Sequence, residues 1–120
     1  MARDIIFISE LAVETIIGIY EWEREIKQPV VFDIEMSGDC ARAALTDAVD
    51  DTLNYKAVAK AVIGFVETSE CQLVETLAEQ VASLILSEFD VQWLRIKVNK
   101  RGAIRGAAGV GVVIERGQVS

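Results

Sequence analysis

The amino-acid sequence predicts an α+β domain in which an antiparallel sheet carries two long helices on one face. Two observations lead to this prediction. Segments with strand-like patterns open and close the chain, and two long segments with helical spacing of apolar residues lie between them. Such an order of strands, helices and strands is typical of α+β folds. The length of 120 residues suits one domain, so we expect residues 1–120 to form a single domain.

The first third of the chain contains three segments that we expect to be strands. Asp4–Ser9 is a short apolar run, and Glu14–Tyr20 is a second strand joined to it by a tight connection. Residues Pro29–Gly38 alternate with a period of two, which indicates a third strand after a charged loop. Proline is tolerated at the first residue of a strand, so Pro29 is compatible with this assignment.

The middle of the chain is predicted to be helical. Cys40–Leu45 forms a short helical turn, and the acidic residues that follow are typical of a loop. Asn54 is a suitable N-cap for a helix from Tyr55 to about Glu67. A second long helix ends near Phe89, because its apolar residues have helical spacing: Leu73, Leu77, Val81, Leu84 and Ile85.

Two closing strands are predicted at about 93–100 and 108–116, and the first of them ends on a lysine. Leu94, Ile96 and Val98 share one face by the period of two, and Lys100 falls in phase with them. A lysine beside a core either extends its ammonium to water or takes part in proton transfer. This segment alone favours the first interpretation.

The composition limits the class of partner. The net charge of −7 argues against binding to the phosphate backbone of nucleic acids. No apolar run approaches the roughly 18 residues of a membrane helix. Hydrophobic residues make up 52% of the chain, which is high for a small protein without a membrane span. We therefore expect this apolar surface to form contacts between subunits of a homo-oligomer.

The sequence contains no histidine, which removes the most common acid–base residue and metal ligand. Any catalysis must then use carboxylates, lysine, tyrosine, cysteine or water, and we expect no dependence on a transition metal. Cys40 and Cys71 lack the spacing of a metal site. No secretory signal opens the sequence, so we expect a cytoplasmic protein with reduced thiols.

Three further side chains are candidates for a functional site, each with a structural alternative. Glu23 follows a predicted strand and is either a ligand-facing carboxylate or part of a solvated loop. Tyr55 opens a helix, where tyrosines usually anchor the helix to a sheet. Glu75 points away from the apolar stripe of its helix. It either complements the helix dipole or binds a planar pair of N–H groups at a subunit boundary.

Four short motifs, taken together, resemble those of bacterial dihydroneopterin aldolases. They are residues 18–23 (GIYEWE), 53–55 (LNY), 73–75 (LVE) and 97–100 (KVNK), and the resemblance extends from Asp4 to Gly117. It implies the tunnelling fold (T-fold), with a four-stranded antiparallel sheet and two long helices on one face. In this fold, four subunits are joined into a barrel around a tunnel, and two rings commonly stack into an octamer.

The same resemblance implies a retro-aldol reaction of folate biosynthesis. 7,8-Dihydroneopterin would give 6-hydroxymethyl-7,8-dihydropterin and glycolaldehyde without a metal, a cofactor or a Schiff base. Lys100 would be the general acid and base, assisted by Glu23 and by Tyr55 of a neighbouring subunit. Glu75 would bind the 2-amino and N3–H edge of the pterin, with Val74 in the same wall.

Two alternatives remain. A related group epimerises the 2′ carbon of dihydroneopterin triphosphate with similar residues, and aldolases of this type also epimerise. Arg101 stands where many family members have proline, and together with Arg105 it could favour a phosphorylated substrate. The Glu-Trp-Glu segment at 21–23 is more typical of the aldolases. The second alternative is a non-catalytic assembly that binds pterins or purines.

Overall fold

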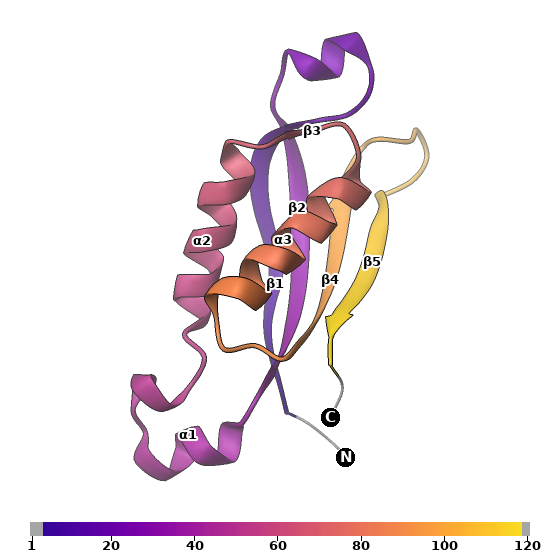
Figure 1. Ribbon diagram of the computed structural model, residues 1–120. Helices are drawn as coiled ribbons and strands as arrows, with labels where there is room; N and C mark the ends of the chain where they lie inside the picture. The colour runs from indigo at the N-terminus through magenta and orange to yellow at the C-terminus, as the bar shows by residue number, and fades with distance from the viewer. Residues whose placement is uncertain (1–3, 119–120) are drawn as a thin grey trace.

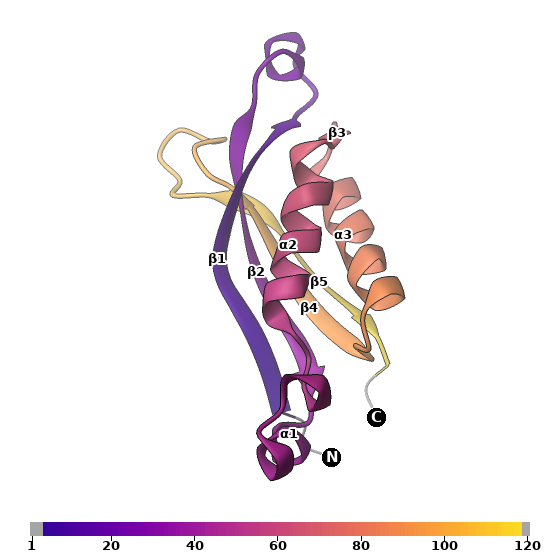
Figure 2. The same ribbon diagram turned by 90° about the vertical axis from the view of Figure 1, so that its left-hand side faces the viewer.

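The computed structural model describes residues 4–118 as a curved sheet with its helices on one face (Figure 1). The side view in Figure 2 shows α2 and α3 stacked against that face, with α1 at the end of the molecule where β1 begins. The strand order is β3-β1-β2-β4-β5. The strands are β1 (Asp4–Ile17), β2 (Gln28–Gly38), β3 (Glu70–Cys71), β4 (Trp93–Lys100) and β5 (Val110–Gly117).

The sheet has five strands rather than the four expected, because the two-residue β3 joins its edge. β3 pairs in parallel with Ile16 and Ile17 at the end of β1, whereas the other neighbours are antiparallel. A segment of two residues carries no periodicity, so its pairing could not be predicted from sequence.

The predicted strands Asp4–Ser9 and Glu14–Tyr20 are joined in a single strand, β1, which ends at Ile17 rather than Tyr20, and the tight connection between them is a bulge. The register with β2 shifts between Ile8 and Leu11, and Glu10 has a φ of 53°. The Asp33 carboxylate accepts the Glu10 backbone N–H at 2.9 Å. A bulge bends a strand without ending it, so it interrupts the apolar pattern much as a turn does.

The helices follow the predicted order. They are α1 (Cys40–Thr46), α2 (Tyr55–Glu67) and α3 (Val74–Glu88), with short 3-10 turns η1 (Glu21–Arg24) and η2 (Val49–Asp51). The bounds of α2 match the prediction, because the Asn54 side chain caps it by accepting the Ala57 N–H at 3.2 Å. No helix within residues 4–118 has the length and apolarity that a membrane crossing requires.

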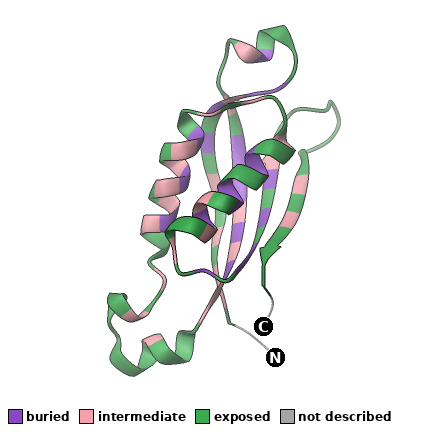
Figure 3. Ribbon diagram, in the orientation of Figure 1, coloured by how far each residue is buried: buried purple, intermediate pink, exposed green. Residues whose placement is uncertain are grey.

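The hydrophobic core lies between the two long helices and the sheet (Figure 3). The helices bury one stripe each, formed by Val58, Val62 and Val66 in α2 and by Leu77, Val81 and Ile85 in α3. Alternate residues of β2 and β4 bury their side chains against these stripes: Phe32, Ile34, Met36, Leu94, Ile96 and Val98. Of the predicted α3 stripe, Leu84 is half-buried and Leu73 is exposed.

Candidate active site

Lys100, the last residue of β4, forms an ion pair with Glu23 of the η1 turn. The side chains of Lys100 and Glu23 are only 13% and 6% exposed. Lys100 continues the buried face of β4, as its phase in the sequence indicated. Its ammonium is directed at a buried carboxylate rather than extended into water, which corrects the interpretation favoured by the strand pattern alone.

The Glu23 carboxylate is held by three donors. It accepts hydrogen bonds from Lys100, from Gln28 Nε2 at 3.1 Å and from the Tyr20 backbone N–H at 3.3 Å. Burial by itself raises the pKa of Glu23, but the hydrogen bonds from Lys100, Gln28 and Tyr20 outweigh it and lower the pKa. Glu23 is therefore an anion at neutral pH, and Lys100 faces a fixed negative charge.

Gly18 makes room for this carboxylate. It follows β1 with a φ of 131°, a conformation that side chains disfavour. A Cβ at this position would lie 2.2 Å from Cδ of Glu23. The chain can therefore bring Glu23 against its own backbone only because residue 18 is glycine.

Lys100 and Glu23 lie in the wall of a cavity of about 490 Å³. Val74 and Glu75, at the start of α3, line the same cavity, and so do the exposed aromatic side chains of η1 and its flank, Tyr20 and Trp22. The first backbone N–H groups of a helix have no acceptor within the helix. The α3 end of the cavity thus offers free N–H donors and the Glu75 carboxylate to a polar ligand.

Tyr55, the remaining predicted site residue, is not part of this cavity. It opens α2, is 57% exposed, and lines a different cavity with Val49 and Leu53. In Figure 1 the start of α2 lies near α1, at the other end of the molecule from η1. A single chain therefore brings together Glu23, Val74, Glu75 and Lys100, but not Tyr55.

Two contributors to the site were not recognised in the sequence. Gln28 hydrogen-bonds to Glu23, and Arg24 hydrogen-bonds to backbone carbonyls beside the cavity. Arg24 ends η1 and Gln28 is the first residue of β2, and the charged sequence around them has no periodicity that would single them out. Arg101 contacts Glu10 at 2.7 Å and is not among the residues that line the cavity.

The sequence profile of the dihydroneopterin aldolase family matches residues 6–115. The chain belongs to this family. It is 51% identical to the dihydroneopterin aldolase of Escherichia coli over 114 residues, which cover 95% of this chain and 93% of that protein. Identity to the Haemophilus influenzae dihydroneopterin aldolase is 47% over 114 residues, or 95% and 97% of the two chains.

A solved relative agrees in structure as well as in sequence. The E. coli dihydroneopterin aldolase, solved in complex with neopterin, has a TM-score of 0.93 and 51% identity, with coverage of 95% of this chain and 99% of that one. A dihydroneopterin triphosphate 2′-epimerase of Pseudomonas aeruginosa is more distant, at 30% identity over 95% of this chain and 91% of the epimerase.

These relationships confirm the predicted tunnelling fold, apart from the number of strands, and the predicted enzyme class. The chain is a carbon–carbon lyase of folate biosynthesis that acts on dihydroneopterin. The higher identity to aldolases than to epimerases agrees with the sequence of the η1 segment, which resembled the aldolases.

Proposed function

We propose that the Lys100–Glu23 pair is the acid–base centre for the retro-aldol cleavage of 7,8-dihydroneopterin. The 2′-hydroxyl loses its proton, the C1′–C2′ bond breaks, and its electron pair passes into the C6=N5 bond while N5 gains a proton. C2′ leaves in glycolaldehyde. Protonation of C1′ and loss of the N5 proton, which restores the C6=N5 bond, then give 6-hydroxymethyl-7,8-dihydropterin. The ring accepts the electrons, so no step requires a metal or a Schiff base.

Lys100 acts on N5 and on the side-chain hydroxyl, through a bridging water. Its ammonium is held by an anionic Glu23, which also faces the hydroxylated tail of the substrate. This placement is supported by the buried ion pair in the cavity wall, the single observation on which the proposal chiefly rests. Proton transfer by a positioned side chain is typically worth about 10²–10⁴-fold in rate.

The pterin ring binds at the α3 end of the cavity in this proposal. The Glu75 carboxylate accepts the 2-amino and N3–H groups in two parallel hydrogen bonds, a geometry in which carboxylates bind planar donors well. Val74 forms the adjoining wall. The complex of the E. coli relative with neopterin supports a pterin as the ligand.

Tyr55 completes the site from a neighbouring subunit. It lines a cavity together with another exposed apolar side chain, Val49 (62% exposed). A second exposed apolar group, which includes Ile19 and Trp22, lies at the other end of the molecule and lines the cavity that contains Lys100 and Glu23. Two different surfaces at opposite ends suit head-to-tail contacts, which close into rings. We propose a tetrameric ring or an octamer of two rings.

The same intermediate allows a secondary 2′-epimerase activity. Once the C1′–C2′ bond is broken, glycolaldehyde can rotate and re-add to the ring-bound fragment with the opposite configuration. The relationship to a dihydroneopterin triphosphate 2′-epimerase supports this side reaction. The proposal also places the protein in the cytoplasm, where free thiols such as Cys40 and Cys71 remain reduced.

The assay that tests the proposal measures glycolaldehyde release from 7,8-dihydroneopterin in the presence of a chelator. Lys100→Ala should lower kcat by about 10²-fold or more, the scale of general acid–base catalysis, and weaken neopterin binding far less. Lys97→Ala is the matched control, because Lys97 is on the same strand but its side chain is exposed on the opposite face. A Lys100→Ala enzyme that keeps its kcat would exclude Lys100 as the acid and base.

A further inference from the structure

Arg24 connects three pieces of backbone beside the cavity. Its Nη1 donates to the carbonyl oxygens of Gly18 at 2.9 Å and Cys71 at 3.0 Å, and its Nη2 donates to the carbonyl of Glu70. The side chain is half-buried and reaches these acceptors from the end of η1. All three acceptors are main-chain carbonyl groups, so Arg24 fixes the position of the backbone at residues 18, 70 and 71 and does not orient another side chain.

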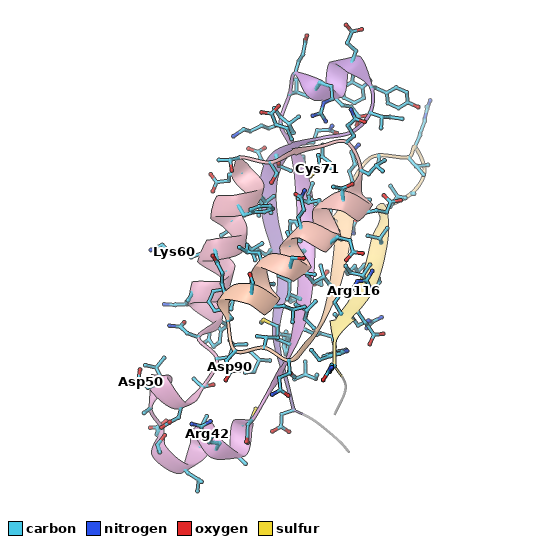
Figure 4. The ribbon with its side chains drawn as sticks, in the orientation of Figure 1. Arg42, Asp50, Lys60, Cys71, Asp90 and Arg116 are labelled. Atoms are coloured by element: carbon cyan, nitrogen blue, oxygen red, sulfur yellow. The ribbon has the colours of Figure 1, made fainter. Side chains whose placement is uncertain are left out.

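The segment that Arg24 holds has few other contacts with the sheet. β3 pairs with β1 through two residue pairs, the Gly18 N–H donates to the Cys71 carbonyl at 3.3 Å, and Thr15 Oγ1 of β1 donates to the Ser69 carbonyl at 3.0 Å. Two residues beyond Cys71 the chain enters α3, which begins with Val74 and Glu75. In Figure 4, Cys71 lies toward the end of the molecule that holds η1 and the start of α3.

We infer that Arg24 is a positioning residue that sets the pterin-binding end of α3 relative to the Glu23–Lys100 pair. Arg24 and Glu23 are consecutive residues of one 3-10 turn. Glu23 fixes that turn to Lys100, and Arg24 fixes it to the strand that leads into Glu75. The inference rests on the proposed role of Glu75 in pterin binding.

Arg24 should therefore affect the distance between Glu75, which binds the pterin ring, and Lys100, which transfers the proton. A substrate bridges Glu75 and Lys100, so a shift of one relative to the other misplaces the ring with respect to the proton donor. Misplacement by about 1 Å can cost about 100-fold in rate. Loss of Arg24 should therefore weaken pterin binding and lower kcat/KM, in addition to any effect on folding.

The test compares Arg24→Ala with Arg116→Ala in the intact oligomer. Arg116 is a matched control because it also ties α3 to the sheet, through Nε and Nη2 bonds of 2.9 and 2.7 Å to the Glu79 carboxylate. It lies on β5, away from Cys71 (Figure 4), and does not line the cavity. The readouts are Tm, neopterin Kd from a fluorescence titration, and kcat and KM for dihydroneopterin.

Arg24→Ala is expected to raise the neopterin Kd about 10-fold or more, while Arg116→Ala lowers Tm and leaves Kd within twofold. Arg24→Lys should fall between wild type and Arg24→Ala, because an ammonium reaches fewer of the three carbonyls. If Arg24→Ala does not fold, Arg24→Lys and Arg24→Gln replace it in the comparison of Kd and Tm with Arg116→Ala.

Glu75→Gln separates failure of this inference from failure of the proposed site. If Glu75→Gln raises Kd but the Arg24 variants change only Tm, Arg24 is structural and the inference is overturned. If Glu75→Gln leaves Kd unchanged, the proposed role of Glu75 is wrong and the inference falls with it. A rise in Kd for both residues, without a rise for Arg116→Ala, supports both.

Discussion

Lys100 and Glu23 form an ion pair that is almost wholly withdrawn from solvent, although 77 residues separate them in the chain. Lys100 is fixed by the last register position of β4, opposite Val30, and Glu23 by a short turn that begins just after Gly18. A buried ion pair adds little net stability, but removing one partner leaves an uncompensated charge. The pair is therefore better explained by the chemistry of the site than by the stability of the fold.

The hydrogen bonds to Glu23 make the stability of the fold depend on pH. The pKa of Glu23 is lowered from its usual 4.5 in the folded protein, so ionised Glu23 stabilises the fold above that value. This contribution should be lost as the pH falls from about 4.5 through the lower pKa of the folded state. Urea unfolding of wild type and Glu23→Gln across this acid range measures it. The difference in unfolding free energy between them should narrow as the pH falls; a constant difference would contradict the lowered pKa.

Gly18→Ala should displace the Glu23 carboxylate and so lower both the stability of the fold and the activity. The new Cβ would collide with the Glu23 carboxylate, and the φ of 131° is strained for any residue with a side chain. We expect a loss of about 1–3 kcal/mol in the unfolding free energy and a marked fall in kcat/KM. Chemical denaturation and the glycolaldehyde assay measure these effects.

Gly64→Ala is the control for that substitution. Gly64 lies inside α2, and a Cβ there would meet no atom within 4 Å. Alanine favours the helix over glycine by about 0.5–1 kcal/mol, so this variant should be slightly more stable and fully active. Equal behaviour of the two glycine variants would argue against the close packing of Glu23 on Gly18.

Features set by local sequence were predictable. Asn54 defined the start of α2 because an N-cap acts within one turn of its helix. The period of two placed Lys100 on the buried face of β4. Glu75 could be placed on its helix, away from the apolar stripe, for the same kind of reason.

Features set by contacts between distant segments were not predictable. The bulge at Glu10 depends on Asp33, 23 residues away, and β3 exists only where it meets the end of β1. The contact between Lys100 and Glu23 could be inferred only from the family resemblance, because nothing in either segment specifies the other. Arg24 went unrecognised since its acceptors are main-chain carbonyls, which have no sequence signature.

Arg101 should have little influence on the choice between free and phosphorylated substrates. Its guanidinium contacts the Glu10 carboxylate. The negative charge of Glu10 neutralises the positive charge of Arg101, which would otherwise attract the phosphates of a triphosphate substrate. We expect Arg101→Ala to change the ratio of kcat/KM for dihydroneopterin and its triphosphate by less than about fivefold, since exposed ion pairs are worth only about 0–1 kcal/mol. Paired assays of both substrates measure this ratio. A large shift toward the free substrate would instead make Arg101 a phosphate-binding residue.

Tyr55 provides the test of a site shared between subunits. Within one chain it lies at the other end of the molecule from Lys100, so Tyr55→Ala and Lys100→Ala impair different contributors to the same proposed site. Each variant alone should have low activity. When the two are unfolded, mixed in equal amounts and refolded together, some sites should combine an intact Lys100 with an intact Tyr55 from the neighbour.

Random assembly gives about one intact site in four, so the mixture should recover about a quarter of the wild-type kcat per site. Refolding each variant alone is the control and should leave its low activity unchanged. A mixture no more active than its parts would mean that Tyr55 does not complete a neighbour's site. Recovery near one quarter requires complementation between subunits, because neither chain can supply both side chains.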